Sequence, residues 1–191
     1  MGGWEPVPNR HPNAREQLLN ELVTTTTRVF PTELFDSLVF HAAHEHFLAN
    51  KPRVLFVSFL ETDAWGHAGR YDLVLESANH FDTFVKRLWE TMQSIDQYAG
   101  KTTFILTTDH GRGSGPEDWK SHGNAIKGAE NIWMAFLGPD TPPLGERSDC
   151  ETVTQNQVAA TLAAFLGQDY QQDVPKAGSR IQAVITPPSE N

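Results

Sequence analysis

The 191-residue chain has a single cysteine, Cys150, which excludes both an internal disulfide framework and a cysteine-rich zinc site. It has no apolar run long enough to span a membrane. It also lacks any cluster of Lys and Arg, and its formal net charge is −9. Nucleic acid and anionic membrane surfaces are therefore not expected as partners. An acidic chain can still handle an anionic substrate where bound cations reverse the local charge.

The composition, with 39% hydrophobic and 20% charged residues, suits one globular domain with a real core. The first residues, "MGGWEPVPNRHPN", have no apolar core of the signal-peptide kind. We therefore expect a soluble protein that is cytoplasmic as written, and exported only if the true N-terminus lies upstream.

The pattern of apolar residues predicts helices that alternate with strands. Three helices are expected over residues 14–23, 33–50 (with Thr32 as N-cap) and 71–95. Strands are expected over 51–60, 101–109 and 131–139, and Thr154 with Gln157 forms a capping box for a last helix that ends at Gly167. This order predicts an α/β fold, a three-layer α/β/α sandwich with a mainly parallel sheet. We expect an extension, mostly loop, over 1–32, a metal-binding α/β domain over 33–170, and a tail over 171–191.

Acidic and imidazole side chains follow two of the predicted strands. The first strand leads into Asp63 and His67, four residues apart across a turn, and the second leads into Asp109 and His110. The long loop after the second strand adds His122. In a parallel sheet the chemistry gathers beyond the carboxyl ends of the strands, so these residues are expected to share one crevice. They suit zinc, manganese or iron better than calcium, although each pair alone would be read as a polar turn.

The segments "ETDAWGHAGRYD", "TTDHGRG", "SHG" and "ETVTQNQVAATLAAFLG", taken in this order, resemble the second half of the alkaline phosphatase superfamily core. Within it they are similar to the phosphodiesterase/nucleotide pyrophosphatase, sulfatase-like and phosphomutase branches. The resemblance implies a metal-dependent hydrolase of small phosphate or sulfate esters with two divalent ions, zinc first, with manganese or iron as alternatives. It assigns Asp63, His67 and His122 to one ion, and Asp109 and His110 to the second.

The resemblance also implies a mechanism whose first half is not visible here. A metal-activated hydroxyl would attack the ester, and water at the first ion would hydrolyse the covalent phospho-enzyme or sulfo-enzyme. In the family the nucleophile is a Thr or Ser that follows an earlier strand ending in Asp. Thr24–Thr27 follow no apolar strand, and Glu21 is a poor substitute for that Asp. We therefore expect the nucleophile upstream, in which case the chain is a fragment, a shortened gene product or a degenerate homologue.

Two other functions remain open at this point. One is a phosphomutase of the same superfamily. The other is a non-catalytic metal-binding remnant that acts through a partner chain, or self-associates, through the face of an incomplete sheet.

Several charged residues are weaker candidates. Arg70, Arg112 and Lys120 lie near the ligands and are candidate contacts for a phosphate or sulfate, while Arg70 can equally pair with Asp72. The run "HAAHEH" lacks the order of a helical zinc protease site, so His41, His44 and Glu45 are interpreted as solvated or boundary residues on an amphipathic helix.

Overall fold

The computed structural model describes residues 12–28 and 34–186, which form two compact units. The first unit comprises the described residues within 1–91 together with 113–121. The second comprises 92–112 together with the described residues after 121. The division into an extension, a domain and a tail stays a prediction. In the described part of the chain, no helix has both the length and the apolar character needed to cross a bilayer.

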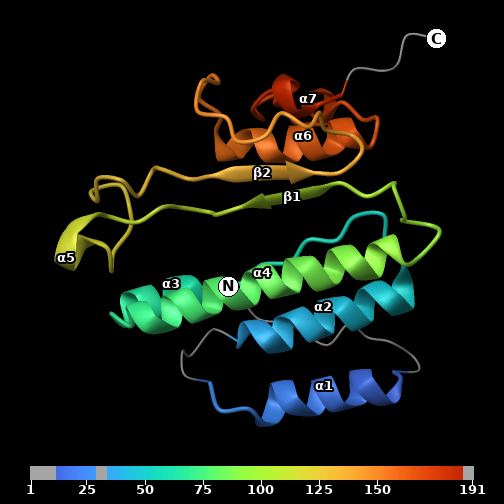
Figure 1. The fold of residues 1–191 in the computed structure, drawn as a ribbon, viewed down its shortest axis with the longest axis vertical. Helices are drawn as coiled ribbons and strands as arrows, with labels where there is room; N and C mark the ends of the chain where they lie inside the picture. Colours follow the sequence, from blue (N-terminus) through green and yellow to red (C-terminus); the bar gives the residue numbers. More distant parts are fainter. Residues whose placement is uncertain (1–11, 29–33, 187–191) are drawn as a thin grey trace. The chain divides into compact units, whose positions relative to one another are not determined.

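The first unit is helical. The described residues begin with helix α1 (Ala14–Thr25), which starts at a capping box between Asn13 and Glu16. Helix α2 (Asp36–Asn50) lies against α1 (Figure 1), and the Nη1 atom of Arg15 donates a 2.9 Å hydrogen bond to Glu45 Oε1. The predicted helix over 14–23 is confirmed. The predicted start of the second helix is wrong, because α2 begins at Asp36, and Thr32 lies outside the described residues.

Aromatic side chains form the core between α2 and α4 (Tyr71–Gln93). Phe40 is fully buried, and its ring stacks on that of Phe84 with centroids 4.3 Å apart. The guanidinium of Arg87 lies 4.8 Å from the Phe40 ring centroid. Aromatic stacking of this kind adds about 1 kcal/mol to the burial of the rings themselves. The long helix α4 thus confirms the predicted helix over 71–95, and its aromatic contacts fix it against α2.

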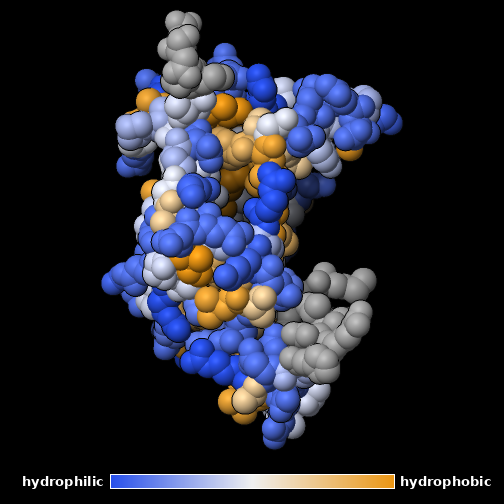
Figure 2. Space-filling view, turned by 90° about the vertical axis from the view of Figure 1, so that its right-hand side faces the viewer, coloured by the Kyte–Doolittle hydropathy of each residue, from blue (hydrophilic) through white to orange (hydrophobic). Residues whose placement is uncertain are grey.

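The predicted strand over 51–60 is wrong. This segment belongs to no strand of the described residues, although its side chains alternate in exposure as in an extended chain. Val54 is 44% exposed and Phe56 is 88% exposed. The physical reason is that a run of β-branched and aromatic residues favours extended backbone, whereas a strand also needs hydrogen bonds to a neighbouring strand. Figure 2 shows hydrophobic residues at the surface among hydrophilic ones.

The second unit contains a small sheet. Strand β1 (Phe104–Thr107) pairs with β2 (Met134–Leu137), with Phe104 opposite Leu137. The pairing is antiparallel (Figure 1). The mixed helix and strand content agrees with the predicted α/β class, whereas the three-layer sandwich with a mainly parallel sheet is not confirmed. Hydrogen bonds close the sheet at both ends, since Thr107 Oγ1 donates to Trp133 O and Thr103 Oγ1 donates to Asp140 Oδ2.

The last helices complete the second unit. The capping box between Thr154 and Gln157 is confirmed, and it opens the 3-10 helix η1 (Gln155–Gln157), which runs directly into α6 (Val158–Phe165). Gly167 ends this helix as predicted. Its φ is +74°, and glycine adopts this left-handed backbone conformation more readily than any other residue. The remaining helices are α7 (Tyr170–Asp173) and η2 (Gln182–Val184).

Candidate metal centre

Asp63 and His67 lie in the first unit on the short helix α3 (Glu61–His67) and not, as predicted, across a turn. Residues four apart on a helix share one face. Accordingly, Asp63 Oδ2 lies 3.5 Å from His67 Nε2. The spacing that suggested a ligand pair in the sequence therefore brings a carboxylate and an imidazole together by one turn of helix.

A buried carboxylate fixes the start of α3. Asp36 is 3% exposed, and its Oδ1 atom accepts hydrogen bonds from the backbone N–H of Leu60 at 2.8 Å and of Glu61 at 3.3 Å. These are N–H groups that a helix start leaves without an intrahelical acceptor. Asp36 thereby caps α3 from a distant part of the sequence and holds the helix that carries Asp63.

The carboxyl group of Glu61 is strongly perturbed by this arrangement. Burial and then the neighbouring charge of Asp36 raise its pKa from the usual 4.5 to about 7, against a smaller opposite effect of His80. Desolvation and a like charge both disfavour the ionised form of an acid. The start of α3 is therefore sensitive to pH close to neutrality.

The end of α3 is a Schellman motif. Gly69 has φ +69°, its N–H donates to Gly66 O at 3.0 Å, and the N–H of Arg70 donates to Trp65 O at 2.9 Å. His67 is the last helical residue before this turn. Both ends of α3 are thus tied down by hydrogen bonds, which orients the Asp63–His67 pair.

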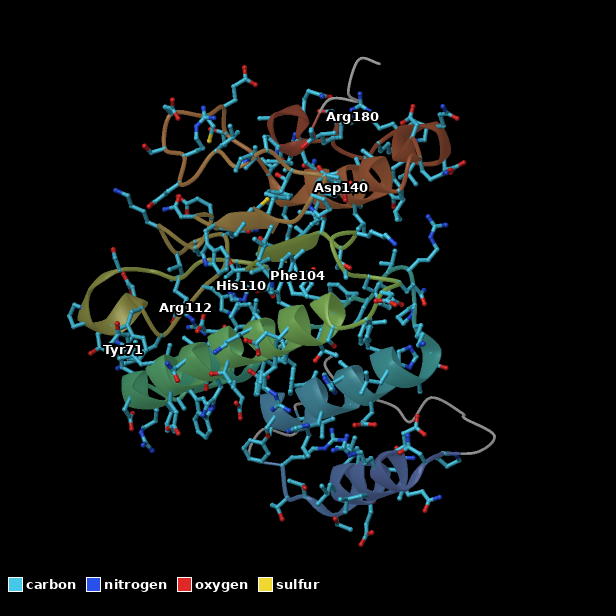
Figure 3. The ribbon with its side chains drawn as sticks, turned by 45° about the vertical axis from the view of Figure 1, so that its right-hand side comes forward. Tyr71, Phe104, His110, Arg112, Asp140 and Arg180 are labelled. Atoms are coloured by element: carbon cyan, nitrogen blue, oxygen red, sulfur yellow. The ribbon has the colours of Figure 1, made fainter. Side chains whose placement is uncertain are left out.

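The second pair, Asp109 and His110, follows β1 in the second unit, and Figure 3 labels His110. His110 Nδ1 lies 2.9 Å from the carbonyl oxygen of Gly111. A carbonyl only accepts, so Nδ1 carries the proton, and Nε2 is the ring nitrogen suited to coordination. Asp109 Oδ1 accepts the backbone N–H of His110 at 3.0 Å, and Gln155 Nε2 donates to Asp109 O at 3.1 Å.

His122 lies beside His110 in the same unit. Their rings are stacked with centroids 3.7 Å apart and planes inclined by 15°. Each ring offers a nitrogen within 4.8 Å of one on the other. The resemblance assigned these two residues to different ions. Their distance suits one shared ion or two adjacent ions, which stand about 4 Å apart in two-metal sites.

Backbone packing around Gly111 supports the His110 geometry, and the sequence alone did not suggest it. The Gly111 N–H donates to Ala129 O at 2.8 Å. A Cβ at this position would overlap the carbonyl oxygen of Asn131 and would lie 2.7 Å from Gly128 O. Only glycine fits where two backbone segments approach this closely. The signal in the sequence was the glycine after Asp-His, but its contact with 128–131 is not local.

The candidate substrate-binding cations Arg70 and Lys120 both have carboxylate partners. Arg70 donates to both oxygens of Asp72, at 3.0 and 2.6 Å, and this ion pair lowers the pKa of the Asp72 carboxyl. Lys120 Nζ donates to Glu117 at 3.0 Å. The alternative pairing of Arg70 with Asp72 is therefore confirmed, and substrate contact by Arg70, Lys120 or Arg112 stays a prediction.

The "HAAHEH" run has structural contacts. Glu45 is buried against Arg15, and His44 Nε2 lies 3.1 Å from Thr91 Oγ1. Burial, the larger cause, and the charge of Arg87 lower the pKa values of His41 and His44. The run lies inside α2, and its contacts with α1 and α4 agree with boundary residues on an amphipathic helix, although Glu45 is buried.

The hydroxyls of Thr24 and Thr25 donate to backbone carbonyls within α1. They show side-chain bonding to the preceding turn that is usual for Thr at a helix end. Nothing in these contacts activates either hydroxyl as a nucleophile.

A family model described as the metalloenzyme superfamily matches residues 12–170. The match spans most of the chain and includes every predicted ligand. The chain belongs to the metalloenzyme superfamily. This superfamily is part of the alkaline phosphatase-like superfamily, as the resemblance of the motifs implied. Searches of curated proteins and of solved structures return no match to this metalloenzyme.

Proposed function

We propose that this metalloenzyme hydrolyses phosphate or sulfate esters with the help of two divalent metal ions, most readily zinc. Asp63, His67 and His122 would hold one ion, and Asp109 and His110 would hold the other. The observation that carries the proposal is the hydrogen bond from His110 Nδ1 to Gly111 O. Imidazoles that bind metals commonly donate their second N–H to a carbonyl in this way. The three-layer α/β/α sandwich predicted from the sequence is part of what we propose.

The donor set fits such ions. Imidazole nitrogens and carboxylate oxygens are the usual ligands of zinc, and manganese and iron accept the same combination. Within each unit a carboxylate already lies near an imidazole, with 3.5 Å between Asp63 and His67 and 3.7 Å between Asp109 and His110. When bound, divalent ions would neutralise the charge of a phosphoryl or sulfuryl group and polarise its oxygens.

The chain's own residues would contribute orientation and charge. The Asp109 side chain is 78% exposed, so it is accessible to a ligand from solution, while the His110 side chain is 26% exposed. On α3 the side chain of Asp63 is 31% exposed and that of His67 is 48% exposed. The carboxylates are thus accessible to ions from solution, and hydrogen bonds hold the backbone that carries them.

The proposal is tested by hydrolysis of p-nitrophenyl phosphate and p-nitrophenyl sulfate by the purified chain with added zinc or manganese. Where the chain releases p-nitrophenol from one of the two esters, we expect the release to depend on the added metal. Asp109→Ala should remove most of this activity, whereas Asp149→Ala, at an exposed carboxylate in an ion pair with Arg147, should leave it unchanged. An Asp109→Ala variant with the wild-type rate would show that the site is assigned wrongly.

A second candidate, self-association of the chain, is favoured by one observation. The segment 53–60 pairs with no strand of the described residues, alternates in exposure from residue 54 to 59, and exposes the apolar side chains of Val54 and Phe56. Exposed apolar edges of this kind promote pairing with another chain. Sedimentation velocity should detect a concentration-dependent dimer that Phe56→Ser weakens. A wild-type chain that stays monomeric at every concentration would rule this out.

A further inference from the structure

The loop over residues 113–121 closes on itself within the first unit. The N–H of Gly113 donates to Ser121 O at 3.1 Å, so the two ends of the loop are joined. Helix α5 (Gly115–Asp118) lies between them, and the N–H of Ser121 also donates to Asp118 O at 2.9 Å. Compact loops with joined ends are frequently functional. This one lies in the sequence between the segments that carry His110 and His122.

The loop presents Trp119 to the first residue of α4. The rings of Trp119 and Tyr71 meet edge to face, with centroids 5.4 Å apart and planes at 83°. Tyr71, at the beginning of α4 (Figure 3), is 59% exposed, and Leu75, one turn further along the helix, is 55% exposed. A pair that served only to fill a core would be covered. These side chains instead form an accessible apolar corner, called here the Tyr71–Trp119 corner.

A hydrogen-bonded turn connects the Tyr71–Trp119 corner to the Asp63–His67 pair. The Schellman motif at Gly69 separates His67, at the end of α3, from Tyr71, at the start of α4, by a hydrogen-bonded turn. The loop rests on the same turn, since Lys120 Cε lies 3.5 Å from where a Cβ of Gly69 would stand. The corner and the Asp63–His67 pair therefore belong to one ordered part of the first unit.

We propose that the Tyr71–Trp119 corner binds the organic group of the substrate and selects esters in which that group is an aryl ring. This inference rests on the proposed function. Two rings at right angles allow a third to lie parallel to one and edge-on to the other, an arrangement that aromatic rings prefer. Leu75 adds apolar surface beside them. Ligand sites combine such apolar walls with a few polar groups, here supplied by the metal ligands.

The experiment uses two stable probes, phenylphosphonate and methylphosphonate, because neither has an ester bond to break. Their affinities for the zinc-loaded full chain are measured by calorimetry. We expect phenylphosphonate to bind about tenfold more tightly than methylphosphonate, as one aromatic contact allows. Trp119→Ala and Tyr71→Ala should each remove most of this difference while leaving the affinity for methylphosphonate unchanged. Trp133→Ala, at a half-exposed tryptophan of the second unit, is the matched control.

The Tyr71→Ala variant is expected to fold, because the side chain of Tyr71 is mostly exposed and its removal leaves no cavity in the core. Three outcomes are informative. Loss of the phenyl preference in both variants, with zinc affinity retained, supports the corner as an aryl subsite. A preference that is absent in the wild type, or unchanged in both variants, overturns the subsite and leaves the hydrolase proposal standing. A wild-type chain that binds no zinc overturns both.

Discussion

The imidazole rings of His110 and His122 are stacked with centroids 3.7 Å apart, although the two residues are twelve positions apart in the sequence. Two protonated rings at this distance would repel each other, whereas two neutral rings can coordinate a cation. The hydrogen bond from His110 Nδ1 to Gly111 O sets one ring in the tautomer that coordination requires. The two rings therefore lie close enough for one shared ion or two adjacent ions, as the proposed site requires.

The close approach at Gly111 predicts that zinc binding depends on this glycine. In Gly111→Ala the new Cβ would overlap Asn131 O, so the backbone after His110 must move. We expect the zinc affinity measured by calorimetry to fall by at least about tenfold, as losses of support around a ligand usually do. Gly145→Ala is the control for backbone strain away from the site: its φ of +68° disfavours alanine, but the new Cβ would meet nothing within 4 Å, so this variant should bind zinc normally. Equal zinc affinities for the two variants would contradict the role given to Gly111.

The raised pKa of Glu61 predicts a specific pH dependence of stability. Between the usual pKa of 4.5 and the folded value of about 7, the folded chain holds a proton that the unfolded chain releases. This contribution to stability is complete at low pH and is lost as the pH rises through about 7. Glu61→Gln keeps the group neutral, so its free energy of unfolding should exceed that of the wild type most at about pH 8.

Urea unfolding of the metal-free chain from about pH 5 to about pH 8 measures this difference. Glu21→Gln, at an exposed position, is the control and should follow the wild-type curve. A constant difference between Glu61→Gln and the wild type across this range would count against the pKa assignment.

We predict that removal of the buried Thr161 hydroxyl weakens the second unit locally, at Ile181. Its Oγ1 atom donates to Gln157 O at 2.8 Å and accepts the N–H of Ile181 at 2.9 Å, and the residue is fully buried. Thr161→Val would leave the Ile181 N–H buried without its acceptor, which costs about 1–3 kcal/mol. Hydrogen exchange of the Ile181 amide should become at least about tenfold faster. Thr161→Ser keeps the hydroxyl and should retain most of the protection; equal exchange in both variants would refute this explanation.

The sequence predicted those features that depend on local chemistry. The capping box at Thr154, the glycine at position 167 and the apolar period of α4 are local signals, and the structure confirms each of them. The stacking of His110 on His122 depends on how a long loop returns, which no local pattern encodes. The closed loop over 113–121 is likewise recognisable only from the bond between its ends.

The prediction for residues 51–60 failed for a related reason. A short, nearly continuous apolar run indicates that a segment favours extended backbone, but not whether another strand lies beside it. The same limit applies to Asp63 and His67, whose spacing indicated proximity but not the helix that provides it. Buried Asp36 was missed because its partners, the N–H groups of Leu60 and Glu61, lie far along the chain.

Zinc binding by the full chain tests the central claim most directly. After equilibrium dialysis against zinc, metal analysis of the wild type is compared with His110→Ala, His122→Ala and the double variant. His46→Ala, at a helix position bonded to Asn50, is the control. We predict that the wild type and His46→Ala retain zinc to the same level, and that each single variant loses part and the double variant most of it. Equal zinc content in the wild type and the double variant would contradict the assignment of His110 and His122 as metal ligands.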